Sequence, residues 1–208
     1  MRSLPALVAC VAGLGLAGAS LAQDESVEDS DQPAAVVIMQ KPPATKLESF
    51  ELSVGSVITR GITRVGSLSS DDGAETNIYA MVLSNHAGAQ ARGLMFEVIC
   101  KDASPVRCYV DEDEVPPLLE AMGTLAKVDK NTLPMDNVDA GYRTKGGIEI
   151  YNRDINGGRI AMIRTTAISS LTGKIYVARA RFRVARLVEI VQQLKAGQDL
   201  LTRMKPEK

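Results

Sequence analysis

The stretch that most constrains the fold is residues 108–131, where a short apolar strand leads into four acids and then an amphipathic helix. The apolar residues recur three and four positions apart, which places them on one face of a helix expected over residues 114–128. They are Val115, Leu118, Leu119, Met122, Leu125 and Ala126. Because proline lacks an amide proton, Pro116 and Pro117 are tolerated only in the first turn. We expect the apolar face of this helix to pack against a β-sheet, which would remove it from water.

The four acids, residues 111–114, come at the start of the predicted helix. We expect Asp113 to be the N-cap, with the other acids stabilised by the partial positive charge of the helix N-terminus. Two further interpretations stay open. One is a Ca²⁺ site, because that ion prefers several oxygen ligands, and the other is an acid–base pair. Capping accounts for the same residues without a ligand.

The chain before this helix predicts one short helix and four strands. Thr45 and Glu48 form a capping box that starts the helix. The first strand is rich in Val, Ile and Thr, and we expect a bend or bulge at Gly61 or Gly66. The second strand is apolar on both sides, which is typical of a central strand covered on two faces. The predicted ranges are 46–53 for the helix and 56–68, 75–85, 93–100 and 106–110 for the strands.

After Asn131 the same order repeats. The predicted strands are 138–144, 147–153, 159–166 and 174–182, and a long amphipathic helix follows from Val184. Asn156 and Gly157 form a strong hairpin signal between two of these strands. The sequence therefore predicts an α+β fold, with two antiparallel four-strand meanders, each followed by an amphipathic helix that covers one face. We expect a single domain over residues 45–208, with possible sub-units 45–131 and 132–208.

The first 22 residues read as a signal peptide, because an apolar run follows Arg2 and ends with small residues before Gln23. An uncleaved anchor and lipidation at Cys10, which ends a Leu-Val-Ala-Cys sequence, are the alternatives. Residues 23–44 are acidic and then proline-containing, and we expect a flexible tail. The prediction is a periplasmic or secreted protein without a transmembrane segment after cleavage.

Two cysteines remain in the exported chain. Cys100 and Cys108 flank a turn signal at residues 102–105, and the oxidising compartment permits a disulfide between them. We predict this disulfide on the assumption that the two strands pair around that turn. Two reduced core thiols, or a metal or redox pair, are the alternatives.

The charges are divided along the chain. Residues 23–140 carry 9 Lys and Arg against 20 Asp and Glu, a balance of −11, and residues 141–208 carry 14 against 5, a balance of +9. The arginines of the last predicted strand alternate and so project from one face, and others lie on neighbouring positions. The predicted basic face consists of Arg179, Arg181, Arg183, Arg186, Arg164 and Arg159. Arginine forks bind carboxylates and phosphates, but the acidic half of the chain is an alternative partner for them.

Motifs for catalysis are sparse. The one histidine, His86, lies in a predicted turn, and the sequence has no G-x-S-x-G elbow, H-E-x-x-H pair or phosphate-binding glycine loop. Residues 152–157 resemble the start of a calcium loop, but Ile163 stands where the bidentate glutamate belongs. We therefore predict no cofactor, no metal and no catalytic residue. A hydrolase-like envelope enzyme whose site cannot be recognised from the sequence is the alternative.

Two resemblances accompany these patterns. The acid-led helix and the run Tyr142-Arg143-Thr144-Lys145-Gly146-Gly147 resemble a set of uncharacterised exported bacterial proteins, which implies a fold but no activity. The element order resembles the paired four-strand-plus-helix units of Whirly and PUR-type single-strand nucleic-acid binders. Fold alone does not transfer function, and the strands lack the surplus of aromatic residues on which bases stack. No nucleic-acid partner is expected.

The functional prediction is an exported envelope protein that acts as a binding or structural module. Its C-terminal arginine-rich face would contact an anionic or protein partner. Examples are lipid head groups, cell-wall polymer and an acidic protein segment.

Overall fold

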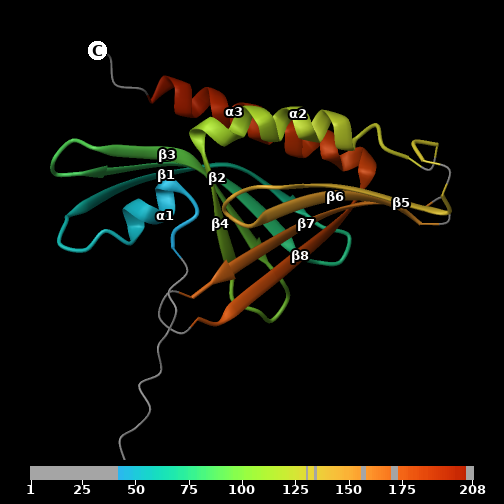
Figure 1. Ribbon diagram of the computed structural model, residues 1–208, viewed down its shortest axis with the longest axis horizontal. Helices are drawn as coiled ribbons and strands as arrows, with labels where there is room; N and C mark the ends of the chain where they lie inside the picture. The colour runs from blue at the N-terminus through green and yellow to red at the C-terminus, as the bar shows by residue number, and fades with distance from the viewer. Residues whose placement is uncertain (1–41, 130, 134, 156–157, 170–172, 205–208) are drawn as a thin grey trace, which may run out of the picture. The chain divides into compact units, whose positions relative to one another are not determined.

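The computed structural model describes residues 42–129, 131–133, 135–155, 158–169 and 173–204, all within one compact unit, Val37–Lys208. The predicted signal peptide, most of the predicted tail and the Asn156–Gly157 turn lie outside the described residues. The fold is α+β, with two antiparallel four-stranded sheets that are each followed by a helix, as predicted (Figure 1).

Sheet A contains the first four strands in sequence order. They are β1 (Ile58–Ser69), β2 (Glu75–Asn85), β3 (Gln90–Ile99) and β4 (Val106–Asp111). The predicted irregularity in β1 is a register shift between Arg64 and Gly66. The prediction that β2 is covered on both faces is confirmed, because Ile78 and Ala80 are buried on one side and Met81 and Leu83 on the other.

Sheet B repeats this plan. Its strands are β5 (Asn137–Arg143), β6 (Ile148–Ile155), β7 (Gly158–Ile168) and β8 (Ile175–Arg183), again in sequence order. In both sheets the last strand runs through a single 3-10 turn, Glu112–Glu114 or Val184–Arg186, directly into a helix. These helices are α2 (Val115–Leu125) and α3 (Leu187–Arg203). The strand–turn–helix unit therefore occurs twice.

The two helices do not cover the sheets that they follow. Helix α2, which follows sheet A, packs on β5 and β6, whereas α3, which follows sheet B, packs on β1, β2 and β3. They lie side by side along the same side of the molecule (Figure 1). Each sheet thus gives one face to a helix, as predicted, but that helix is the one that follows the other sheet. Both helices have apolar residues at the same spacing, so the apolar face of each fits either sheet. Because each half of the chain supplies the helix that covers the other half, the two halves are intertwined.

One hydrophobic core is shared by the inner faces of both sheets and the two helices. Its largest fully buried side chains include Phe96 from sheet A and Phe182 from sheet B. The sheets meet where β4 lies against β7 and β8. At this contact the Cys108 thiol donates a hydrogen bond to the Thr166 carbonyl oxygen, with an S···O distance of 3.4 Å.

The outer face of sheet A is covered by the short helix α1 (Lys46–Glu51). The predicted capping box is present, and the Asp111 carboxylate accepts hydrogen bonds from the amides of Lys46 at 2.8 Å and Leu47 at 3.2 Å. Leu47 is completely buried and packs with Met81, Leu83, Ala91 and Met95. Gly93 makes this packing possible, because a Cβ there would lie 2.8 Å from the Leu47 side chain and 2.1 Å from the Val110 carbonyl.

Three local predictions are wrong. Asp113 does not cap α2, because its carboxylate pairs with the Lys46 ammonium at 2.9 Å. Helix α2 ends before Val128, whose carbonyl accepts hydrogen bonds from the side chains of Asn152 and Arg159. The predicted disulfide is absent. Cys108 is paired with Phe96 across the ladder, whereas Cys100 lies beyond the end of β3 in a turn closed by the Ala103 amide.

Candidate functional site

The outer face of sheet B is the strongest candidate for a binding surface. Antiparallel neighbours form three rows across the sheet, from β5 to β8. They are Arg143, Glu149, Arg164, Arg179; Gly141, Tyr151, Met162, Arg181; and Asp139, Arg153, Ile160, Arg183. We call the six arginines of these rows the arginine face. Both long helices lie on the opposite side, as Figure 1 shows, so no described helix covers it.

Strand β8 carries half of the arginine face. Along this strand Ala178, Ala180 and Phe182 are buried in the core. Arg179, Arg181 and Arg183 alternate with them and are exposed, as the sequence pattern predicts. Within the described part of the chain, no carboxylate forms an ion pair with any of these three guanidinium groups. Their guanidinium groups therefore lie at the surface without a counter-ion among the residues that the structure describes.

The other arginines of the face have counter-ions. Glu149 lies between two guanidinium groups, those of Arg143 and Arg164, and its distance to Arg164 is 3.1 Å. Asp139 pairs with Arg153 at 2.7 Å. The three rows thus carry six arginines against two carboxylates, and the excess of positive charge is concentrated on β8.

The edge of β8 is held by the turn after β1. The Asp71 amide donates to the Arg181 carbonyl at 2.8 Å, and the Arg181 amide donates to Asp72 at 3.3 Å. Partial burial raises the pKa of Asp72, but hydrogen bonds from the Ser70 hydroxyl and the Arg181 amide outweigh it and leave the pKa below its usual value. Asp72 therefore stays ionised and fixes the backbone of β8.

Two arginines of the predicted basic face serve the fold. Arg159 donates to the carbonyls of Ala126 at 3.0 Å and Val128 at 2.7 Å and so completes the end of α2. Arg186 forms a fork with the Glu189 carboxylate, at 3.1 and 2.9 Å, and lies over the Phe182 ring. The structure brings Arg164 together with Arg179, Arg181 and Arg183 but places Arg159 and Arg186 elsewhere.

Sequence reasoning missed Arg143 and Arg153. Both lie on strands that were correctly predicted, and their signal was the alternation of buried and exposed positions along β6. Ile148, Ile150 and Asn152 are buried there, so Arg153 had to face outward. The pairing of β5 with β6 then places Arg143 on the same side, opposite Glu149.

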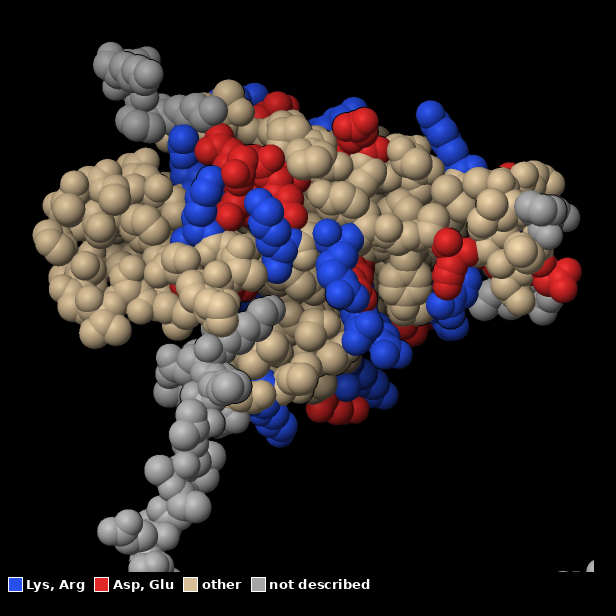
Figure 2. Space-filling view, viewed as in Figure 1, with Lys and Arg blue, Asp and Glu red and all other residues tan. Residues whose placement is uncertain are grey.

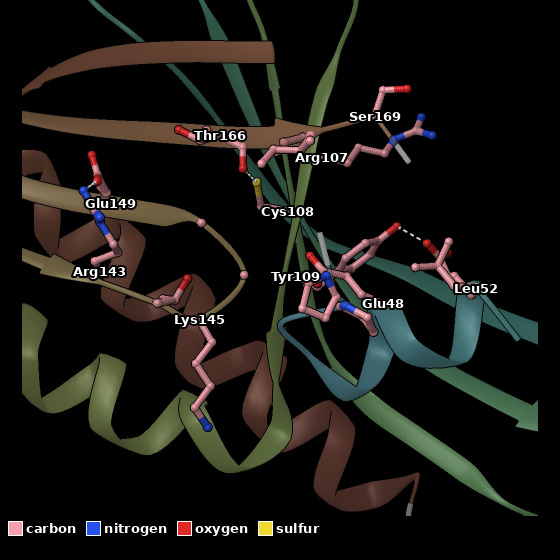
Figure 3. A pocket seen from close by; sticks show the side chains of 18 of the residues that line it. Glu48, Leu52, Arg107, Cys108, Tyr109, Arg143, Lys145, Glu149, Thr166 and Ser169 are labelled. Carbon is pink, nitrogen blue, oxygen red and sulfur yellow. Dashed lines mark hydrogen bonds and ion pairs between the residues drawn. The ribbon is translucent and has the colours of Figure 1, made fainter. Parts of the chain in front are cut away.

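A cavity of about 480 Å³ adjoins the first row of the arginine face. One wall is formed by Arg143, Glu149 and Arg164, and α1 and β4 form the opposite side with Leu52 and Tyr109 (Figure 3). Tyr109 donates a 2.7 Å hydrogen bond to Glu51, and burial together with that carboxylate raises the pKa of Tyr109. Glu149 and Glu51, two of the carboxylates at this cavity, therefore already have partners.

The residues considered for catalysis or metal binding lie at different places in the fold and do not form a common site. His86 is exposed in the turn between β2 and β3 and is not among the residues that line the cavity. The four acids 111–114 contact different partners: the start of α1, Arg92, Lys46 and the Lys145 amide. The Asn152 side chain of the calcium-loop pattern binds the Leu125 and Val128 carbonyls at the end of α2. These residues hold elements of the fold together.

The chain matches no protein-family model and no curated protein. The resemblance to exported bacterial proteins and to Whirly and PUR-type units stays a prediction. Among the described residues, no helix is long and apolar enough to cross a membrane.

Proposed function

We propose that this protein is a non-enzymatic binding module of the cell envelope, and that its arginine face binds an extended anionic polymer. The observation that carries the proposal is the exposure of three arginines, Arg179, Arg181 and Arg183, on an open sheet face without described ion-pair partners. The export of the protein is part of the proposal and rests on the sequence of residues 1–22.

The geometry of β8 favours a linear ligand. Residues two apart on a strand are separated by about 6.6–6.8 Å, so the three guanidinium groups form a straight row. Each planar fork can bind a carboxylate or phosphate through two parallel hydrogen bonds. A polymer with acid groups repeated along it can therefore contact all three arginines at once, whereas a single small anion can contact one or two.

Apolar side chains lie beside this row. Ile160 and Met162 on β7 are half-buried and occupy the same face, opposite Arg183 and Arg181. The Tyr151 hydroxyl donates to the Met162 sulfur at 2.7 Å, and Arg153 lies over the Tyr151 ring. The face thus offers charged contacts along one edge and apolar side chains next to them, which suits the backbone of a polymer.

The test measures binding of residues 23–208 to two immobilised probes, poly-L-glutamate and inorganic polyphosphate. We expect retention that falls as salt rises, because exposed ion pairs are screened. Replacing Arg179, Arg181 and Arg183 together by Ser should weaken binding about ten-fold or more, since three exposed ion pairs each contribute roughly 0.5 kcal/mol.

The matched control replaces three exposed lysines on other surfaces, Lys101, Lys127 and Lys195, by Ser. It changes the net charge by the same amount and should retain most of the binding. Equal loss in both triple variants would show that only net charge matters and would overturn the proposal. Retention on anionic lipid vesicles but on neither polymer would also overturn it, in favour of a membrane-binding surface.

A further inference from the structure

Among the described elements, strand β1 has one edge without a partner strand. It is the first strand of sheet A and pairs only with β2 among the described strands. Residues 59–64 are six consecutive exposed residues within a regular strand. An exposed edge strand presents unpaired amide and carbonyl groups, and proteins usually protect such edges with prolines, inward charges or a covering segment.

The other half of β1 has such protection. Beyond the bulge between Arg64 and Gly66, helix α3 lies against the strand. The Gln193 side-chain amide donates to the Ser67 carbonyl at 3.1 Å, and the Arg186 guanidinium donates to the Ser69 carbonyl. The same strand is therefore covered at one end and open at the other, with the bulge as the boundary.

The open half borders an uncharged surface. Residues 52–59 and 84–91 contain no Lys, Arg, Asp or Glu. Large apolar side chains are exposed here, among them Val54 at 98%, Val57 at 75% and Ile62 at 45%. In Figure 2 the end of the molecule at left, where β1 and β3 project in Figure 1, shows no charged side chain. Exposed apolar side chains beside a free strand edge are typical of a protein interface.

We propose that β1 pairs antiparallel with β1 of a second copy of this chain, about a two-fold axis at Gly61, to form a continuous eight-stranded sheet. A second copy is favoured as the partner by the near-repeat Ile58-Thr59-Arg60-Gly61-Ile62-Thr63-Arg64. Around Gly61 it is complementary to itself: each Arg60 faces Ile62, each Ile58 faces Arg64 and each Thr59 faces Thr63. Thr–Thr pairs and the absence of like charges stabilise cross-strand pairing.

The neighbouring symmetric registers are less favourable. An axis at Arg60 places Arg60 opposite itself, and an axis at Ile62 places Arg60 opposite Arg64. Like charges directly opposite one another destabilise a ladder. With the axis at Gly61, the open segments of the two copies pair over most of their length, and no arginine lies directly opposite another arginine.

The two arginines of this segment are already neutralised within the chain. Arg60 pairs with Glu51 at 2.6 Å and Arg64 with Glu75 at 3.0 Å. Their charged ends are held at the surface of their own subunit, so their aliphatic stems can lie against Ile62 and Ile58 of the second copy. The interface therefore buries apolar surface and backbone groups without adding net charge.

The first test is the mass of residues 23–208 by analytical ultracentrifugation over a range of concentrations. We expect a dimer that Ile62→Lys weakens at least about ten-fold, because it places an ammonium opposite Arg60 and removes an apolar contact. The control is Ile175→Lys, the same change at an exposed position of β8. A monomer at every concentration would overturn the proposal, as would a dimer that both variants weaken equally.

The second test fixes the register by cross-linking in a Cys100→Ser background. Gly61→Cys should form a covalent dimer on mild oxidation, because opposed residues of an antiparallel pair have Cα atoms about 4.5–5.5 Å apart, within disulfide range. A Cβ at Gly61 is tolerated, since the nearest atom, the Val82 carbonyl oxygen, would lie 3.8 Å away. Thr59→Cys alone should not cross-link, because it faces Thr63, whereas Thr59→Cys with Thr63→Cys should. Cross-linking of Thr59→Cys but not Gly61→Cys would refute this register.

Discussion

The two sheets share one plan but differ in their outer faces. The outer face of sheet A carries Met81, Leu83 and Met95 and is covered by α1. The corresponding face of sheet B carries six arginines and has no covering helix among the described elements. The sequences differ at alternate positions of the strands: β2 is apolar on both sides, whereas the second half of β8, from Ala178 to Arg183, is apolar on one side and carries arginines on the other. A face covered by the chain itself serves the fold, and a charged face left open is available to a partner.

Each outer face also contains a shared carboxylate. In sheet A, Glu97 is 6% exposed and accepts hydrogen bonds from Arg107 at 2.8 Å and Tyr79 at 3.2 Å. In sheet B, Glu149 is half-buried and lies between Arg143 and Arg164. Burial together with Glu97 raises the pKa of Tyr79, which therefore remains a hydrogen-bond donor. Because Glu97 is more buried, its loss should cost the fold more.

The largest difference between the faces should appear when apolar side chains are truncated. Leu47→Ala removes a fully buried side chain from the contact between α1 and sheet A and should lower the free energy of unfolding by about 2–5 kcal/mol. Met162→Ala, on the half-buried face of sheet B, should cost about 1 kcal/mol or less. Urea denaturation measures both, and equal losses would contradict the distinction between a covered and an open face.

Removing the two carboxylates should give the next largest effect. Glu97→Gln leaves Arg107 and Tyr79 without their ionised acceptor, and we expect a loss of about 1.5–3 kcal/mol. Glu149→Gln should cost about 1 kcal/mol or less, because its partners are partly exposed. It should also strengthen binding to polyphosphate, since it frees two guanidinium groups of the arginine face. Weaker polyphosphate binding by Glu149→Gln would argue against that face as the binding surface.

A smaller effect is expected from the tyrosines. Tyr109→Phe removes the hydrogen bond to Glu51 and should cost about 1 kcal/mol, whereas Tyr151→Phe removes a bond to sulfur and should cost less. Burial and Glu51 raise the pKa of Tyr109, so its contribution is present below the unfolded pKa of about 10 and is lost as pH rises above it. Ultraviolet titration of phenolate should show a late-ionising tyrosine that Tyr109→Phe removes.

The smallest effect concerns the ion pair between Lys46 and Asp113, which lies in the acidic 3-10 turn before α2. A hydrogen bond from Lys46 lowers the pKa of Asp113, so this pair contributes above the unfolded pKa of about 3.8 and is lost as pH falls through the folded value. Both side chains are more than half exposed. Asp113→Asn should leave the melting temperature nearly unchanged at pH 7 and make it less sensitive to acid below pH 4. A large loss at pH 7 would show that Asp113 has a further structural role.

Local patterns predicted the elements because each depends on neighbouring residues. The capping box at Thr45, the position of Pro116 and Pro117 at the start of α2, and the bulge of β1 near Gly66 are all present. The alternation along β8 also placed Arg179, Arg181 and Arg183 outside, since side chains of a strand point to opposite faces in turn.

The errors concern the register between neighbouring strands and contacts between segments that are distant in the sequence. Cys100 and Cys108 were expected to face each other, but the ladder places Val98 opposite Val106, so the cysteines are offset by four positions, roughly 13 Å. The turn that sets this register includes Cys100 and a positive φ of 57° at Asp102. Likewise, Arg159 and Asn152 complete the end of α2 only because that helix lies on the sheet of the other half.

The sequence by itself determined the eight strands, the two amphipathic helices and the side of β8 that carries its arginines, because these follow from the spacing of residues a few positions apart. Only the tertiary structure decided which sheet each helix covers and which arginines keep a counter-ion within the chain. The reason is that burial of apolar surface is non-directional, so two similar helix faces fit two similar sheets, and the choice between them depends on packing of the whole chain.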